Sequence, residues 1–209
     1  MQSWGTRSRW DVRETGPEPT KSGVIGLLGC ALGLPRRDPG LLELDRSLRF
    51  GVRLDRPGRI ETDFQTVTGR HRQANGKLRP DDFTVLSPRD YLHDAAFLVI
   101  LEGDRPLLER LDAALRAPFW PLFLGRKSCP PTRPVSLGLR DAYASLDAAL
   151  IHEPLLDRAD ARAAPYTAWA EPIDVAPGDV ARSDKLRDDP LRLYDSRFAR
   201  RLTVPADRP

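Results

Sequence analysis

Cysteine, histidine, lysine and long apolar runs are all scarce in this chain of 209 residues. Its two cysteines, Cys30 and Cys129, are too few for a disulfide framework, which favours a reducing compartment. The longest apolar run, 95–101, is far shorter than the about 18 residues of a membrane span. Charged residues follow soon after Met1, a pattern unlike that of a secretory signal peptide. We therefore expect a cytoplasmic protein without membrane contact.

The few histidines argue against a zinc site. His71, His93 and His152 lie far apart, and neither cysteine stands at ligand spacing from them. The Gly-x-Ser-x-Gly elbow of serine hydrolases is also missing. The segment 16–22 resembles a P-loop superficially, but Thr20 replaces the second glycine and the spacing is one residue short. The sequence thus predicts no metal and no other cofactor, and it does not support nucleotide hydrolysis.

Arginine supplies almost all the positive charge. Lysine and arginine number 33 against 30 acidic residues, for a net charge of +3, and only four of them are lysines. Two stretches, 64–80 and 113–140, contain no acidic residue. Acid-free basic segments are typical of phosphate contacts, although codon usage and solvation also produce arginine-rich loops. Their basic residues are Arg70, Arg72, Lys77, Arg79, Arg116, Arg126, Lys127, Arg133 and Arg140.

Hydrophobic periodicity predicts helices packed on an antiparallel sheet. One helix is expected between Pro19 and Pro35, with glycines that permit close approach of another element, and a second over 105–117. The run 95–101 is expected to be a strand buried on both faces. This order is typical of an α+β sandwich with a basic finger over 69–80. The other expected strands are 47–54, 60–68, 83–86, 167–173 and 198–204.

The N-terminal part of the chain combines cations with aromatic and hydroxyl side chains. Trp4 and Arg9 lie close in sequence, and aromatics interleaved with arginine stack bases and bind phosphates. Burial of the tryptophan in the core is the alternative. Thr20, Lys21 and Ser22 stand at an expected helix N-terminus, where free N–H groups attract phosphate. These hydroxyls have a second interpretation as simple helix caps.

The loop 124–131 is a second candidate for RNA contacts. It places Arg126, Lys127 and Ser128 between a glycine and two rigid prolines, an arrangement suited to a sugar–phosphate turn. Basic neighbours lower the pKa of a thiol and so favour reactivity, but no base can be assigned to Cys129. We interpret Cys129 as a structural thiol.

Four motifs in sequence order resemble one family. They are QSWG at 2–5, PTKSGVIGLLG at 19–29, RDYLHDA at 89–95 and LGRKSCP at 124–130. On these motifs the chain resembles CasD, the fifth CRISPR-associated family in its type I-E form. The resemblance covers about residues 2–140, and the tail resembles the family only loosely.

The resemblance implies a ferredoxin-like, RRM-like domain over 1–136 with a protruding thumb at about 63–91, and a small β-rich region over 137–209. It implies a non-catalytic subunit, one copy per Cascade complex, that grips the 5′ handle of the CRISPR RNA in antiviral defence and contacts the backbone and large subunits. The expected RNA-binding residues are Trp4, Arg9, Thr20, Lys21, Ser22, Arg70, Arg72, Lys77, Arg89, Arg126, Lys127 and Ser128.

Two other functions stay open at this point. One is a metal-independent endoribonuclease that processes repeat RNA, as relatives in type I-C systems do. It would use His71, Tyr91 or His93 as acid–base groups and Lys21 to steady the phosphorane. The other is a protein scaffold whose basic loops contact acidic partners.

The start of the chain departs from the family pattern. Family members open with an apolar strand before the Gln-x-Trp-Gly motif, whereas here Met1 directly precedes Gln2. In a ferredoxin-like sheet that strand would be central and would pair with 95–101. Its loss would leave backbone groups unpaired, at a cost in stability and with a tendency to aggregate. We therefore expect the natural protein to begin about a dozen codons upstream.

Overall fold

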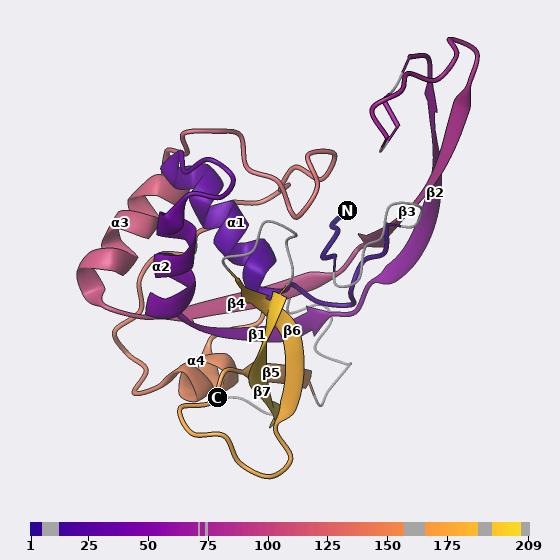
Figure 1. The fold of residues 1–209 in the computed structure, drawn as a ribbon. Coiled ribbons are helices and arrows are strands. Elements are labelled where there is room, and N and C mark those ends of the chain that lie inside the picture. The colour runs from indigo at the N-terminus through magenta and orange to yellow at the C-terminus, as the bar shows by residue number, and fades with distance from the viewer. Residues whose placement is uncertain (6–12, 71, 74, 157–165, 188–193, 206–209) are drawn as a thin grey trace.

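The computed structural model describes residues 1–5, 13–70, 72–73, 75–156, 166–187 and 194–205 (Figure 1). It contains a five-stranded sheet with helices on both faces and a two-stranded ribbon that projects from the body (Figure 1). Within these residues, no helix combines the length and the apolar character needed to cross a bilayer. The mixture of helices and antiparallel strands confirms the predicted α+β class.

The main sheet joins early and late parts of the chain. Its strands are β1 (Arg49–Arg56), β4 (Ala96–Glu102), β5 (Tyr166–Ala170), β6 (Val180–Leu186) and β7 (Tyr194–Val204). Their order is β4-β1-β5-β7-β6, and every neighbouring pair is antiparallel. Val52 of β1 pairs with Val99 of β4 on one side and with Trp169 of β5 on the other. The tail strands therefore extend one continuous sheet, and a domain division at residue 136 stays a prediction.

Three helices cover one face of the sheet: α1 (Lys21–Leu32), α2 (Pro39–Ser47) and α3 (Arg105–Arg116). Ile25 of α1 and Leu111 of α3 are buried there against Phe50 of β1. Burial of each such side chain stabilises the fold by about 1.5–3 kcal/mol. Gly29 lies so close to Leu41 of α2 that a Cβ at this position would overlap with it. The predicted close approach of a second element to this glycine is thus a helix–helix contact.

A short helix, α4 (Leu146–His152), packs on the opposite face of the sheet. Gly51 of β1 leaves room for the Leu150 side chain, which a Cβ would contact at 2.8 Å. The neighbouring Arg53 is fully buried and donates to the Leu150 carbonyl at 2.7 Å, while its Nε lies 2.5 Å from Asp55. A buried arginine is stable only when its donors are satisfied, so these bonds fix the end of α4 to the sheet.

The projecting ribbon consists of β2 (Arg59–Thr68) and β3 (Thr84–His93), joined by a tip over 69–83 (Figure 1). We call residues 59–93 the thumb. The strands stay in antiparallel register from the Arg59–His93 pair to the Thr68–Thr84 pair. The thumb expected at about 63–91 is therefore present and extends further at its base.

Several elements differ from the sequence-based expectations. Helices α2 and α4 and strand β6 were not expected, and the returning strand expected at 83–86 continues to His93. The strand expected to be buried on both faces, β4, has only Leu98 fully buried. The reason is its place in the sheet, because β4 is an end strand that pairs with β1 alone among the described strands.

Lys21 does not present its charge to solvent. Its ammonium is buried, 2.9 Å from a Glu171 carboxylate oxygen and 4.0 Å from Asp45. The Lys21 backbone N–H, at the start of α1, donates to the Asp184 carboxylate at 2.9 Å. The anion predicted at this helix N-terminus is therefore a side chain of β6, which also pairs with buried Arg197. These ion pairs join α1 and α2 to the sheet.

Replacing the buried lysine tests this arrangement. We expect Lys21→Met to lower the free energy of unfolding by about 3–5 kcal/mol, because it leaves Glu171 and Asp45 without their buried cation. The exposed Lys77→Met is the matched control and should change stability by less than about 0.5 kcal/mol. Urea denaturation measures both. Equal stability of the two variants would contradict a structural role for Lys21.

The pH dependence of stability tests the same cluster through Asp45. Burial raises the pKa of the Asp45 carboxyl, and Lys21 only partly offsets this. The Asp45 contribution to stability is thus present below the ordinary aspartate pKa and lost as pH rises through the raised value. Asp45→Asn should therefore be more stable than the natural protein at pH 7, and this advantage should shrink on acidification. A pH-independent difference in thermal melts would contradict this.

Candidate nucleic-acid interface

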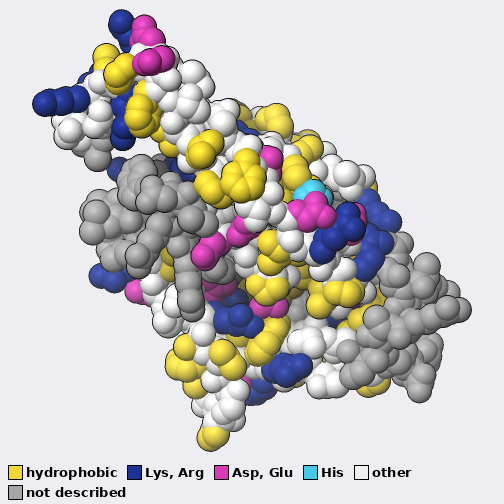
Figure 2. All heavy atoms as spheres, turned by 90° about the vertical axis from the view of Figure 1, so that its right-hand side faces the viewer, with side chains coloured by type: hydrophobic (Ala, Val, Ile, Leu, Met, Phe, Trp, Pro, Cys, Tyr) yellow, Lys and Arg dark blue, Asp and Glu magenta, His cyan; other side chains and the backbone are white. Residues whose placement is uncertain are grey.

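The thumb tip gathers cations at the end of the ribbon. Figure 2 shows lysine and arginine side chains there, next to acidic ones. Arg70 pairs with Asp81 at 2.6 Å, and Arg72 donates to the Gly76 carbonyl at 3.0 Å. Among the described residues, none forms an ion pair with the exposed Lys77 ammonium. The tip thus keeps at least one cation free for an anionic ligand.

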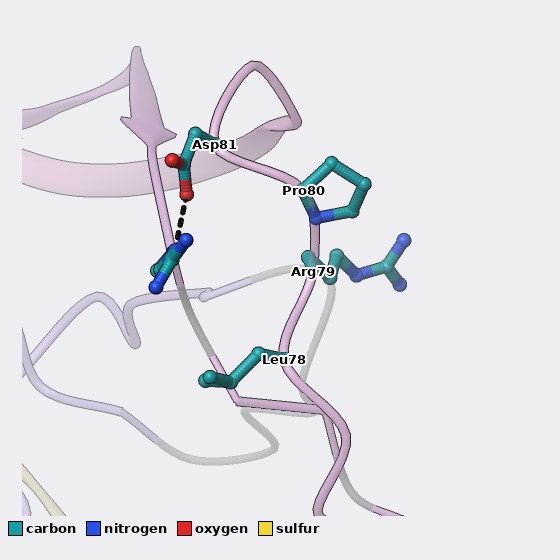
Figure 3. A pocket seen from close by; sticks show the side chains of 5 residues that line it. Leu78, Arg79, Pro80 and Asp81 are labelled. Atoms are coloured by element: carbon teal, nitrogen blue, oxygen red, sulfur yellow. Dashed lines mark hydrogen bonds and ion pairs between the residues drawn. The ribbon is translucent and has the colours of Figure 1, made fainter.

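A shallow depression of about 530 Å³ opens in this tip. Arg79 and Leu78 line it together with the Arg70–Asp81 pair (Figure 3). The Arg79 side chain points away from Leu78 and Asp81 (Figure 3), and its guanidinium lies 3.9 Å from the centre of the Phe83 ring. This cation–π contact holds the guanidinium while leaving its charge available.

The loop 124–129 is closed on itself and rests on the N-terminal segment. The Leu124 N–H donates to the Cys129 carbonyl at 2.7 Å, and the Ser3 N–H donates to the Leu124 carbonyl at 3.0 Å. Gly125 has a φ of +85° and lies directly against the Ser3 carbonyl, where a Cβ would overlap with the oxygen. Glycine is required here for both reasons.

Arg126 ties this loop to the base of the thumb. Its guanidinium donates to the Asp90 carbonyl at 2.9 Å and to the Arg13 carbonyl at 2.6 Å. It also lies over the Tyr91 ring, 4.8 Å from the ring centre. Arg13 runs alongside β3, where the Asp90 N–H donates to its carbonyl at 3.0 Å. Arg126 was predicted as a phosphate contact, but its guanidinium connects three chain segments. We call these contacts of Arg126 the brace.

Lys127 and Ser128 follow the brace and are exposed. Among the described residues, Lys127 has no ion-pair partner. The Ser128 hydroxyl lies 3.2 Å from the Tyr91 hydroxyl, to which the Gln65 amide donates at 3.3 Å. Burial acts to raise the pKa of Tyr91, but the hydrogen bond to Ser128 and the Arg126 guanidinium outweigh it, so the pKa lies below its usual value.

A cavity of about 370 Å³ lies where the thumb meets this loop. Its lining is rich in hydrogen-bond acceptors, and two of them are carboxylates, Glu61 and Asp63. Arg59 lies 2.6 Å from Glu61, and His93 lies 3.8 Å from it. Across the described residues, no group of three His, Cys, Asp or Glu side chains is arranged to hold a metal ion. The lining residues are Met1, Glu61, Thr62, Asp63, Gln65, Tyr91, His93 and Ser128.

The other predicted RNA contacts are less available. Trp4 is 3% exposed and packs over Gly23, so it is a core anchor and not a stacking platform. Thr20 is buried and caps α1 by accepting from the Gly23 N–H at 3.2 Å, and Ser22 is half-buried beside it.

Two predicted contacts remain to be placed. Arg89 is half-buried on β3, with its Nε donating to the Ser87 hydroxyl at 3.3 Å. Arg9 lies outside the described residues, as does His71. The expectation that Lys21 faces a ligand is corrected, because its ammonium is buried in the ion pairs described above.

Sequence analysis missed two polar residues of the interface. Gln65 lines the cavity, and Arg13 supplies a carbonyl to the brace. The alternation of Glu61, Asp63 and Gln65 along β2 was the available signal for the first, since alternate residues share one face of a strand. Nothing in the sequence around Arg13 signals that its backbone meets β3.

Known proteins provide independent comparisons. A family model described as CRISPR-associated protein (Cas_Cas5) matches residues 1–201. The CRISPR system Cascade subunit CasD of Escherichia coli (strain K12) is 36% identical over 167 residues, which covers 74% of this chain and 74% of that protein.

Solved structures show the same likeness in three dimensions. A chain of a CRISPR RNA-guided surveillance complex superposes with a TM-score of 0.73 at 32% identity, over 98% of this chain and 87% of that one. A crystal structure of a Cas protein superposes with a TM-score of 0.70 at 36% identity, over 98% of this chain and 90% of that one. The thumb-bearing α+β fold and these similarities in sequence and structure agree, and the chain belongs to the CRISPR-associated Cas5 family.

Proposed function

We propose that this protein is a non-catalytic RNA-binding subunit of a type I-E Cascade-like surveillance complex. One copy would grip the 5′ handle of the CRISPR RNA and contact the backbone and large subunits. Membership of the Cas5 family supports the class of complex, because relatives carry the names Cascade subunit and RNA-guided surveillance complex. The observation that carries the RNA contact is the exposure of two lysines that form no ion pair with any described residue, Lys77 at the thumb tip and Lys127 at the thumb base.

Phosphates would bind at these two ends of the thumb. At the tip, Lys77 is exposed without an ion-pair partner among the described residues, and Arg79 keeps its charge available over Phe83. At the base, Lys127 and Ser128 stand on a loop that Arg126 fixes in place. Preorganised cations and hydroxyls position a nucleic-acid backbone without reading its sequence. The affinity would therefore depend strongly on salt.

The cavity at the thumb base suits a base edge better than a phosphate. Glu61 and Asp63 repel phosphate, but their carboxylates accept hydrogen bonds from exocyclic amino groups. Gln65 and Ser128 supply further polar groups. A nucleotide bound here would turn its base inward and keep its phosphate on Lys127.

The thumb also has a face suited to a neighbouring protein subunit. Ile60, Phe64 and Leu86 are 50%, 71% and 64% exposed. Phe64 pairs with Pro88, and Thr66 pairs with Leu86, so these side chains share one face of the ribbon. An isolated two-stranded ribbon is marginal in water, and contact with another subunit would cover this apolar face.

A nuclease role receives less support than binding. The lysine assigned to steady the phosphorane, Lys21, is buried in ion pairs with Glu171. Tyr91 is 3% exposed and engaged by Ser128 and Gln65. We therefore propose no catalytic residue and no cofactor.

Salt titration of RNA binding tests this function. The double variant Lys77→Ala/Lys127→Ala should weaken binding to cognate handle RNA and reduce the slope of log K against log salt by about one to two units. The matched control, Arg46→Ala/Arg110→Ala, removes the same charge from exposed positions on α2 and α3. It should leave the slope unchanged.

Two results would contradict the proposal. An unchanged slope in the double variant would remove Lys77 and Lys127 from the interface. Specific cleavage of repeat RNA in EDTA, resolved on a denaturing gel of the same samples, would favour the endoribonuclease.

A further inference from the structure

Two adjacent aromatic side chains, which are not among the residues assigned to RNA, are exposed at the C-terminal end of α1. Phe119 is 70% exposed and Trp120 is 39% exposed. Their rings meet edge to face, with centres 5.0 Å apart and planes at 88°. We call residues 118–121, together with Gly33, the aromatic ledge. Exposed aromatic pairs of this kind are rare on a surface that contacts only water.

The backbone holds the ledge rigidly. The Phe119 N–H donates to the Ala31 carbonyl at 2.9 Å, and the Trp120 N–H donates to the Cys30 carbonyl at 3.3 Å. Both acceptors belong to the last turn of α1, where a helix end leaves carbonyls available, and the Cys30 carbonyl also accepts from the Gly33 N–H at 3.3 Å. Prolines precede Phe119 and follow Trp120, which restricts the backbone further.

Gly33 sets the position of the Phe119 ring. It has a φ of +75°, and a Cβ there would lie 2.8–3.1 Å from three atoms of that ring. The ring therefore has one side against the α1 C-terminus and the other side open. A hydrophobic side chain that is exposed and held in place loses little entropy on binding, which is the property of a preorganised interface anchor.

Exposed arginines follow the ledge residue Gly33 in sequence. Arg36 and Arg37 are exposed three and four residues after Gly33, and neither has an ion-pair partner in the described part of the chain. The stretch 113–140, which contains residues 118–121 of the ledge, has no acidic residue. In addition, no described residue accepts a hydrogen bond from the Trp120 indole N–H. The ledge thus offers an apolar centre and an indole donor unused by the described residues, with Arg36 and Arg37, which we call its cationic rim, close to Gly33 in sequence.

We propose that the aromatic ledge docks an acidic segment of another protein subunit, which packs an apolar side chain against the exposed surface of the two rings. A carboxylate or carbonyl of that segment would accept the Trp120 indole N–H, and its acidic residues would face Arg36 and Arg37. This inference rests on the proposed function only in taking the protein to be one subunit of a multi-protein complex.

The geometry favours a protein ligand over RNA. Single-stranded RNA stacks its bases on open, parallel aromatic faces. Here the two rings are perpendicular, and Gly33 closes one side of Phe119. The exposed surface of a perpendicular pair instead suits contact with an aliphatic or aromatic side chain.

Assembly with the other subunits of the complex tests the proposal. Phe119→Ala/Trp120→Ala keeps the backbone bonds and removes both rings. In a pull-down by tagged partner subunits, its apparent affinity for them should be at least about tenfold lower than that of the natural chain. The control, Tyr194→Ala/Phe198→Ala, removes two aromatics that are 44% and 41% exposed on β7 and should assemble normally.

A surface variant tests whether unfolding explains a loss of assembly. Arg36→Glu reverses one rim charge and should also weaken assembly, by an amount that falls as salt is raised. Handle-RNA binding by the isolated chain should stay within about twofold for all of these variants. Normal assembly of both the double variant and Arg36→Glu would overturn the proposal.

RNA measurements on the same variants separate the two proposals. In one outcome, Phe119→Ala/Trp120→Ala loses RNA binding, and its assembly fails only because the RNA is not bound. That outcome would overturn protein docking in favour of a platform for nucleobases. Absence of RNA binding in the natural chain, combined with defective assembly of the double variant, would instead reject the proposed RNA function and support the ledge.

Discussion

The Arg126 guanidinium is the interaction on which the candidate interface depends. It donates to backbone carbonyls of Arg13 and Asp90, which belong to two different segments, and it lies over Tyr91. Gly125 makes this possible, because the loop approaches the N-terminal segment more closely than any side chain would allow. This brace acts together with the contact between the Ser128 and Tyr91 hydroxyls to fix Lys127 and Ser128 relative to the thumb. The loop 124–129 is thereby held in a fixed position.

Charge has two separate roles in this protein. Buried ions, such as Lys21 with Glu171 and Asp184 with Arg197, satisfy one another and join helices to the sheet. They are unavailable to a ligand, because removing one partner would leave an uncompensated charge in the core. Lys77 at the thumb tip and Lys127 beside Ser128 stay exposed, and neither forms an ion pair with a described residue. Burial therefore decides which of many arginines and lysines can contact RNA.

Sequence analysis predicted the elements that carry strong periodicity and missed those that do not. Helices α1 and α3 and strands β1 and β2 were expected close to their observed bounds. Helix α2 begins with the cap Asp38 and then Pro39, a start signal that was present but not used. Strand β6 carries the buried polar Asp184, so its pattern resembles a surface loop. The fate of Lys21 could not be predicted, because its partner Glu171 lies 150 residues away in sequence.

The central claim is that RNA follows the thumb from its base to its tip. Photo-crosslinking of handle RNA to the assembled complex, followed by mass spectrometry of the linked peptides, tests it most directly. The account predicts crosslinks in the peptides that contain 72–79 and 126–128. Crosslinks confined to the helical face of α1, α2 and α3, with none on the thumb or on the 124–129 loop, would contradict it.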